Sequence, residues 1–206
     1  MKEYPSIQSW PGTGGVSVYV FDKLDGSNCR AEVNKKGEIS KFGKRNGLLD
    51  DQTPYLNEAR IIIPNKYGDL LGRMVRDQRW DMATFYFEFV GPQSFAGWHA
   101  AEPHDCVLFD IAPHKKGFLE PKEFLKLCGD TVDHVRLLHQ GNFTKDIADA
   151  VTNSTLENMT FEGIVAKGAL DRKTGLNFSF KWKSLLWLKK LKERCGDNEK
   201  LYEQLA

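Results

Sequence analysis

The sequence predicts an α+β protein with mainly antiparallel sheets. Short segments rich in β-branched and aromatic residues outnumber the segments with helical spacing. Several of these strand-like segments follow one another directly and are joined by short turns, as in hairpins. A doubly wound fold would instead alternate strands and helices regularly along the chain, so we do not expect one here.

The expected strands have apolar and aromatic residues at alternating positions. One strand covers 16–22, "VSVYVFD", and two strands joined by a turn at Lys36-Gly37 cover 28–42. The remaining strands are expected at 83–91, 105–113, 132–140, 161–168 and 177–183.

The expected helices are recognised by apolar spacing and by residues typical of helix ends. Leu70, Leu71, Met74 and Val75 lie three to four residues apart within 65–80, which predicts an amphipathic helix. Short helices are expected at 121–129, with Pro first and Gly last, and at 143–154, with Thr144 as N-cap. From residue 184 onward, spaced leucines predict one amphipathic helix or a pair.

Composition favours one folded domain over 1–206, ending in a helical segment over 184–206. The hydrophobic fraction is 41%, and the formal net charge of +1 does not by itself indicate a polyanionic partner. No apolar run is long enough for a membrane span, and the first residues lack a secretory signal pattern. We therefore expect a cytoplasmic protein whose four scattered cysteines are reduced thiols, not disulfides or zinc ligands.

Lys23 lies at the end of the first strand, in "VFDKLDGSN", where Gly26 permits a turn with positive φ. A lysine amine attacks an electrophile only when it is neutral, which requires desolvation or crowding by other cations. Lys181 and Lys183, two apart on one strand face, could crowd Lys23 together with Lys167 and also neutralise polyphosphate oxygens. Each lysine taken alone is more often a solvated surface residue, and it is their joint occurrence on strands flanked by apolar residues that favours a site.

Two glutamates lie in apolar strands. Glu88 is flanked by phenylalanines in "FYFEFVG", and Glu162 precedes glycine in "FEGIVAK". Burial of a carboxylate is costly unless it is paired or binds a cation, so both are candidates to hold Mg²⁺ against a triphosphate. The alternative is that both point to solvent. The segment "GTGG" at 12–15 lacks the pattern of a phosphate loop and is expected to be a flexible lead-in.

Six short segments together resemble the motifs of the covalent nucleotidyltransferase superfamily of ligases and mRNA capping enzymes. In chain order they are "KLDGSN", "GKRNG", "FYFEFVGP", "VLFDI", "EGIVAK" and "FKWK". The chain looks most similar to RNA ligases related to phage T4 RNA ligase 2, over about residues 16 to 183. The resemblance implies an ATP-grasp-like nucleotidyltransferase domain with two mainly antiparallel sheets flanked by helices and the nucleotide in the groove between them.

The resemblance also implies the catalytic residues. Lys23 would attack the α-phosphate of ATP and become lysyl-AMP, while Lys181 and Lys183 would bind the α-phosphate and stabilise its transition state. Glu162 would organise Mg²⁺ or Mn²⁺.

Other positions correspond to the family's nucleotide-binding residues, Asp25, Gly26, Asn28, Arg45, Glu88, Phe109 and Lys167. By resemblance Asp25 would contact the ribose or support the lysine, and Asn28 would lie near the reactive phosphate. Arg45 and Glu88 would hold the ribose, and Phe109 would stack on the adenine.

The chain departs from the family at its C-terminal end, because only 23 residues follow Lys183. That length leaves no room for the C-terminal domain of the phage enzymes or for the OB-fold of DNA ligases and capping enzymes. The expected substitutes for RNA binding are the basic helix "WLKKLKER" (187–194), the arginines at 73, 76 and 79, or a partner protein.

The leading hypothesis is an ATP-dependent RNA ligase that seals 3′-hydroxyl and 5′-phosphate RNA ends through lysyl-AMP and an adenylylated 5′ end. A phage or a virus is a source compatible with this resemblance. The alternatives are a DNA ligase adenylation domain, a GTP-using capping enzyme, and a non-catalytic nucleotide- or RNA-end-binding module of the same fold.

Overall fold

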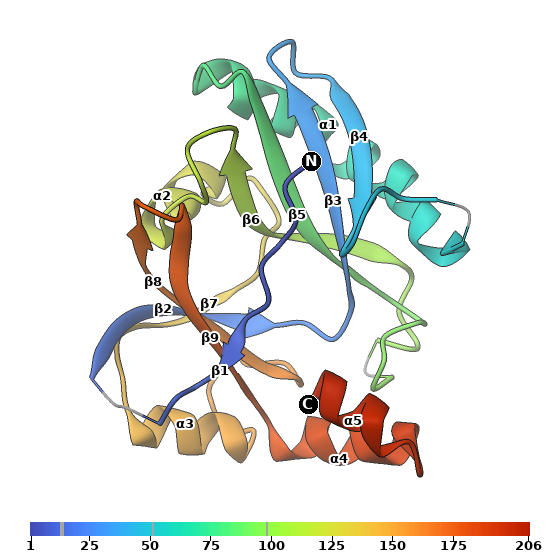
Figure 1. Ribbon diagram of the computed structural model, residues 1–206, viewed down its shortest axis with the longest axis vertical. Helices are drawn as coiled ribbons and strands as arrows, with labels where there is room; N and C mark the ends of the chain where they lie inside the picture. Colours follow the sequence, from blue (N-terminus) through green and yellow to red (C-terminus); the bar gives the residue numbers. More distant parts are fainter. Residues whose placement is uncertain (13–14, 51, 98) are drawn as a thin grey trace.

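Two β-sheets form the centre of the molecule in the computed structural model, which describes residues 1–12, 15–50, 52–97 and 99–206 (Figure 1). All strand pairs in both sheets are antiparallel except one short parallel pair at an edge. Helices flank the sheets (Figure 1). The predicted α+β class with two mainly antiparallel sheets is confirmed.

The first sheet has five strands in the order β1-β9-β8-β2-β7. These strands are β1 (Gln8–Ser9), β2 (Val16–Lys23), β7 (Leu137–Phe143), β8 (Gly163–Asp171) and β9 (Leu176–Lys183). Its edge strand β1 pairs in parallel with β9, while β2 lies between β8 and β7.

The second sheet has four strands in the order β4-β3-β5-β6. They are β3 (Ser27–Asn34), β4 (Ile39–Lys44), β5 (Met82–Val90) and β6 (Asp105–Pro113). The chain passes from the first sheet to the second between the end of β2 and the start of β3. This crossing coincides with the "KLDGSN" segment, so the two sheets meet at the lysine that the sequence singles out.

The helices cover the sheets and the lower end of the molecule in Figure 1. In chain order they are η1 (Pro54–Glu58), α1 (Ala59–Asp77), α2 (Pro121–Cys128), α3 (Lys145–Thr152), α4 (Leu185–Cys195) and α5 (Glu199–Leu205). No described helix is long and apolar enough to cross a membrane.

The largest apolar cluster lies between the four-stranded sheet and α1. Ile63, Tyr67 and Leu71 lie four residues apart on one face of α1 and are fully buried with Phe85 and Phe87 of β5. Burial of each such side chain stabilises the fold by about 1.5–3 kcal/mol. A second cluster packs α3 against the five-stranded sheet.

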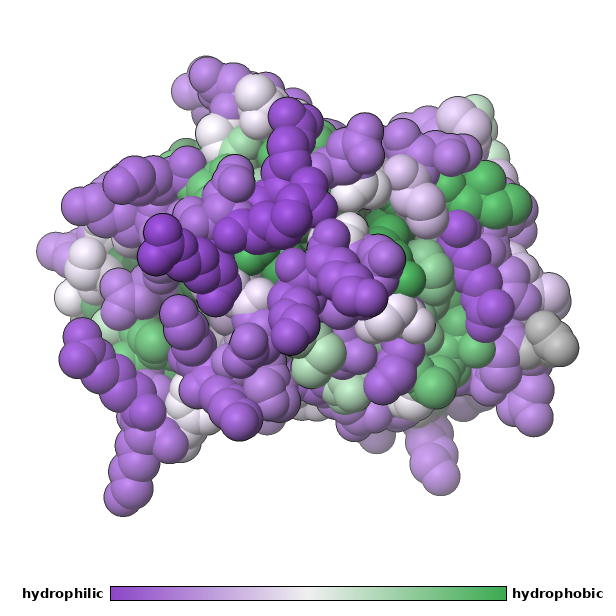
Figure 2. Space-filling view, turned by 90° about the horizontal axis from the view of Figure 1, so that it is seen from above, coloured by the Kyte–Doolittle hydropathy of each residue, from purple (hydrophilic) through white to green (hydrophobic). Residues whose placement is uncertain are grey.

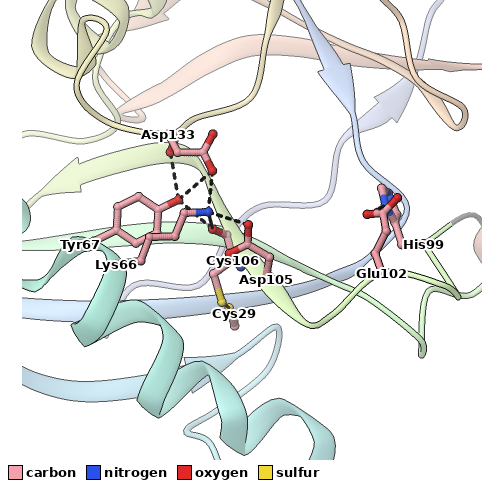
Figure 3. Close-up of polar contacts among 8 residues, drawn as sticks. All are labelled: Cys29, Lys66, Tyr67, His99, Glu102, Asp105, Cys106 and Asp133. Atoms are coloured by element: carbon pink, nitrogen blue, oxygen red, sulfur yellow. Dashed lines mark hydrogen bonds and ion pairs between the residues drawn. The ribbon is translucent and has the colours of Figure 1, made fainter.

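An ion-pair cluster fixes α1 to the second sheet (Figure 3). The Lys66 ammonium lies 2.6 Å from both Asp105 and Asp133, and the Tyr67 hydroxyl donates a hydrogen bond to the Cys106 carbonyl at 2.7 Å. These contacts join α1, β6 and the segment before β7. Such a cluster is structural, since every charge in it has a partner.

The expected elements are largely present, with two shifts. The helix expected at 65–80 begins at Ala59, because Pro64 is accommodated near its start instead of ending it. The strand expected at 132–140 is Leu137–Phe143, because Val132 and Val135 enter the core from an irregular segment.

Several end signals are confirmed. The Thr144 hydroxyl accepts a hydrogen bond from the backbone N–H of Ile147, and the C-terminal segment is a helix pair.

The four cysteines are free thiols. The lead-in expected at 12–15 falls partly on residues 13 and 14, which lie outside the described residues. Hydrophilic residues cover most of the face seen from above, with small apolar patches between them (Figure 2).

Candidate nucleotide site

A cavity of about 500 Å³ lies where the two sheets meet. Its walls come from the ends of β2, β8 and β9 on one side and from β3, β5 and β6 on the other. Every site residue expected from the sequence lines it, namely Lys23, Asp25, Gly26, Asn28, Arg45, Glu88, Phe109, Glu162, Lys167, Lys181 and Lys183. The fold thus gathers residues that are up to 160 positions apart in the chain.

Strand register places the two central lysines on either side of one glycine. Lys23 of β2 lies opposite Gly163, and Gly163 lies opposite Lys183 of β9. Gly163 has φ +142°, and a Cβ there would lie 2.2 Å from the Trp182 carbonyl oxygen. Only glycine fits this close approach, and the residue before it, Glu162, is thereby brought between the lysines.

The Glu162 carboxylate bridges the two lysines. One of its oxygens lies 2.8 Å from Lys23 Nζ and the other lies 3.2 Å from Lys183 Nζ. Its backbone carbonyl accepts a hydrogen bond from Ser184 N at 3.0 Å, which fixes the turn into α4. The Glu162 side chain is 5% exposed, so its charge is compensated by these lysines more than by water.

The protonation state of Lys23 differs from the expectation. Burial lowers the pKa of Lys23, but the nearby carboxylates of Glu162 and Glu88 outweigh burial, so its pKa lies above the ordinary value of 10.5. The expectation rested on crowding of Lys23 by other lysines, whereas the carboxylates have the larger effect on its pKa. In the nucleotide-free site the amine is therefore protonated.

The other two lysines behave as expected of a crowded cationic group. Burial, and then repulsion by Lys23 and Lys181, lowers the pKa of Lys183 to about 8 against the opposing attraction of Glu162. Burial and the charge of Lys23 also lower the pKa of Lys181. The Lys183 ammonium lies 4.0 Å from the centre of the Trp187 ring, a cation–π contact.

Gly26 is required for a reason other than the expected one. Its φ is not positive, so it does not form the turn that the sequence suggested. A Cβ at Gly26 would instead lie 2.5 Å from the Phe89 carbonyl oxygen and 2.9 Å from Glu88 Cγ. The absent side chain allows β3 to start directly against β5.

Two polar side chains near this crossing bear on ligand binding. Asn28 lies opposite Glu88 in the β3–β5 pair, and its Oδ1 atom is buried without a hydrogen-bond partner among the described residues. Asp25 is buried, and its Oδ2 accepts a hydrogen bond from Ala96 N at 3.0 Å. Asn28 is therefore available to a ligand, whereas Asp25 also holds the loop after β5.

The charge of Glu88 is poorly compensated. Burial raises the pKa of Glu88 to about 7, with further increases from Glu162 and Asp25 and opposing effects of Lys23 and Arg45. Arg45 is exposed at the cavity rim, beyond the end of β4. The cavity thus has buried negative charge beside Lys23 and an exposed positive charge at its mouth.

Lys167 has different partners from those expected. Its ammonium lies 2.8 Å from Asp110 Oδ2 and donates to the Phe109 carbonyl at 2.8 Å, with both charged side chains buried. This ion pair joins β8 of the first sheet to β6 of the second. Lys167 therefore stabilises the cavity wall, and it remains among the residues that line the cavity.

Phe109 occupies a bulge of β6. Tyr86 lies opposite Asp110 and Phe87 opposite Leu108, which leaves Phe109 as the extra residue. Its ring contacts the Tyr4 ring edge-on at 4.9 Å, and both residues line the cavity.

Some wall residues were missed by the sequence analysis, above all Tyr4, Tyr55, Phe95 and Trp187. They belong to the N-terminal segment, to η1, to the loop after β5 and to α4. No local pattern distinguishes them from other aromatic residues. Asp22 was also missed, and the only signal for it was its position directly before Lys23.

Residues 16–183 match the family model described as RNA ligase. The chain belongs to the RNA ligase family. Solved structures of similar fold include variants of the Naegleria gruberi RNA ligase. One with ATP and Mn is 25% identical with a TM-score of 0.63, and an apo variant is 26% identical with a TM-score of 0.63.

A third structure, the Naegleria gruberi RNA ligase with PPi, is 26% identical with a TM-score of 0.59. In all three cases the alignment covers 87% of this chain and 52% of the other, so this chain spans about half the length of these ligases. No curated protein gives a significant match to the sequence.

The first prediction concerns Gly26→Ala. The added methyl group would meet backbone atoms of Phe89, which cannot rotate away, so overpacking should destabilise the protein by about 1–3 kcal/mol. Urea unfolding measures this change. Gly68→Ala in α1 is the control for an open position without positive φ, where no atom lies within 4 Å. A Gly26→Ala protein as stable as wild type would contradict the close approach.

The second prediction concerns Glu88→Gln. The pKa of Glu88 is about 7 in the folded protein and about 4.5 when unperturbed, so the folded state binds more protons between these values. Wild-type stability should fall as pH rises from 4.5 to 7. Glutamine has no charge to bury, so the variant should be more stable than wild type at pH 8, by up to about 3 kcal/mol.

Thermal unfolding at pH 5 and pH 8 measures this difference, with exposed Glu157→Gln as the matched control. The stabilisation by Glu88→Gln should shrink toward pH 5. An equal change in stability at both pH values would show that burial of the Glu88 charge does not destabilise the fold.

Proposed function

We propose that this chain is the nucleotidyltransferase part of an ATP-dependent RNA ligase. Lys23 Nζ attacks the α-phosphorus of ATP, a phosphoramidate bond forms, and the bond to pyrophosphate breaks. The AMP is then transferred to an RNA 5′-phosphate, and attack by an RNA 3′-hydroxyl seals the strand and releases AMP. The observation that carries this proposal is the Glu162 carboxylate held between Lys23 and Lys183 in a buried cavity.

The two late lysines suit the binding of phosphate. Lys181 and Lys183 lie two apart in β9 and face the same cavity as Lys23. Both are partly desolvated, which strengthens their attraction for anionic oxygens. Positive groups fixed where charge develops are the main source of catalysis in phosphoryl transfer.

The carboxylates suit a divalent cation shared with a substrate. Among the described residues no group of three or more His, Cys, Asp or Glu side chains could by itself hold a metal ion. Mg²⁺ is usually bound by one or two carboxylates together with substrate phosphates, which fits Glu162 with Glu88 nearby. Such an ion, when bound, supplies positive charge to the phosphate oxygens.

The same carboxylate controls the nucleophile. While Glu162 faces Lys23, the ammonium form is stabilised and cannot attack. Any group that engages the Glu162 carboxylate removes the strongest attraction on that ammonium, and burial then lowers the pKa of Lys23. The site thereby couples occupation of the nucleotide pocket to activation of the amine.

The remaining walls suit a purine nucleoside. The Phe109 and Tyr4 rings offer apolar surface, and the unpartnered Asn28 Oδ1 offers an acceptor. Similar solved ligases contain ATP with Mn or PPi, which supports ATP as the nucleotide here. Membership of the RNA ligase family favours RNA over DNA ends.

The third prediction tests this proposal with Lys23→Ala. Incubation of wild type with α-labelled ATP and Mg²⁺ should leave label on the protein after denaturation. The variant lacks the nucleophile and should lose the label at least about 10³-fold. Lys189→Ala, on the exposed face of α4, should label like wild type. A wild-type protein that binds ATP without covalent label would instead indicate a non-catalytic binding module.

A further inference from the structure

A second groove of about 490 Å³ lies at the other end of the β8–β9 hairpin from the nucleotide cavity. It is formed by the loop after β6, the turn between β8 and β9, and the first two residues. Its lining includes a set of exposed basic side chains, Lys2, His114, Lys115, Lys116, Arg172 and Lys173. No step of the proposed reaction uses these residues.

The two turns that carry the cations are docked against each other. A Cβ on Gly117 would lie 2.7 Å from Gly175 Cα, so the two backbones touch. Phe118 N donates a hydrogen bond to the Gly175 carbonyl at 3.1 Å, and Lys2 Nζ donates to the same carbonyl at 3.5 Å. The cations therefore lie on a fixed framework.

Nearby acidic groups are already committed. Glu32, the acidic residue in the lining, is buried and lies 3.5 Å from both the N-terminal amine and Lys41 Nζ. Asp171 accepts hydrogen bonds from Lys173 N and from the Thr174 hydroxyl, both at 2.9 Å. Within the described part of the chain, the side chains of Lys115, Lys116, Arg172 and Lys173 form no ion pair. The groove thus concentrates positive charge in a chain of net charge +1.

The basic face of α4 is partly compensated by carboxylates, whereas among the described residues the α1 arginines have only backbone partners. On α4, Lys190 lies 3.1 Å from Glu193 and Lys192 pairs with Glu199. On α1, Arg76 donates to the Lys36 carbonyl at 3.1 Å. The α4 and α1 faces were the RNA-contact candidates suggested by the sequence, and the groove differs from both because its cations line one cavity on two turns that are docked against each other.

We propose that this groove binds the phosphodiester backbone of an RNA duplex arm whose end lies in the nucleotide cavity. No Phe, Tyr or Trp is among its lining residues, so it offers no platform for stacking unpaired bases. Duplex RNA is recognised mainly through backbone contacts and shape, which suits a groove of unpaired cations. This inference rests on the proposed ligase function of the cavity.

The geometry links groove and cavity on one face. Strand β9 begins at Leu176 beside the groove and ends at Lys183 in the cavity, a span of about 23 Å at roughly 3.3 Å per residue. The N-terminal segment follows the same path, since Lys2 lines the groove while Tyr4 and Ile7 line the cavity (Figure 1). At the rise of an A-form RNA duplex, about 2.8 Å per base pair, the arm must be about eight base pairs long to reach the groove.

The fourth prediction tests the groove with a double variant, Lys115→Glu with Lys173→Glu. Both side chains are exposed and outside the cavity, so labelling by α-labelled ATP should stay at the wild-type level. Affinity for a nicked RNA duplex with arms of 14 base pairs should fall about 10- to 100-fold at 0.1 M salt, and the salt dependence should become shallower by about two counterions. Lys189→Glu with Lys190→Glu on α4 is the matched control and should bind like wild type.

Arm length provides the sharper test. With both arms cut to four base pairs, the duplex cannot reach the groove, and wild type and variant should bind equally. Equal binding of wild type and variant to the long-armed duplex, at every salt concentration, would overturn the groove as an RNA site. Because binding is measured separately from labelling, loss of label in wild type would refute the ligase proposal without deciding the groove.

Discussion

The functional site depends on one buried carboxylate that faces two lysines. Glu162 lies 2.8 Å from Lys23 and 3.2 Å from Lys183, and the Glu162 and Lys183 side chains are almost fully buried. Removal of one partner from such a group leaves an uncompensated buried charge, which typically costs about 3–5 kcal/mol. The arrangement is therefore stable only while each charge has a partner. A ligand that replaces one partner changes the pKa values of the remaining groups.

The architecture explains why this arrangement can exist. Lys23 is the last residue of β2 in the first sheet, and β3 starts the second sheet only four residues later. Gly26 and Gly163 allow backbones to approach where any side chain would clash. The buried Lys167–Asp110 pair ties the two sheets together behind the cavity. The walls are thus rigid, while the charges inside them can be redistributed by a ligand.

The sequence predicted which charged residues meet at the cavity because each motif is local. A strand followed by "KLDGSN", or a strand containing "EGIVAK", places its charged residues at strand ends whatever the detailed packing. The prediction failed where the outcome depends on tertiary neighbours. Three outcomes depend on segments distant in the chain. They are the ion-pair partner of Lys167, the protonation state of Lys23, and the positions of Tyr4 and Trp187 in the cavity wall. The β7 shift has the same cause, since the core accepts Val132 and Val135 without strand pairing.

The central claim is that Glu162 keeps Lys23 protonated until the carboxylate is engaged. An NMR pH titration of the protein with ¹³C-labelled lysine side chains tests it directly, with the Lys23 signal assigned from Lys23→Arg. In the nucleotide-free wild type the pKa of Lys23 should lie above its ordinary value, and in Glu162→Gln it should fall. An unchanged pKa of Lys23 in Glu162→Gln would contradict the account.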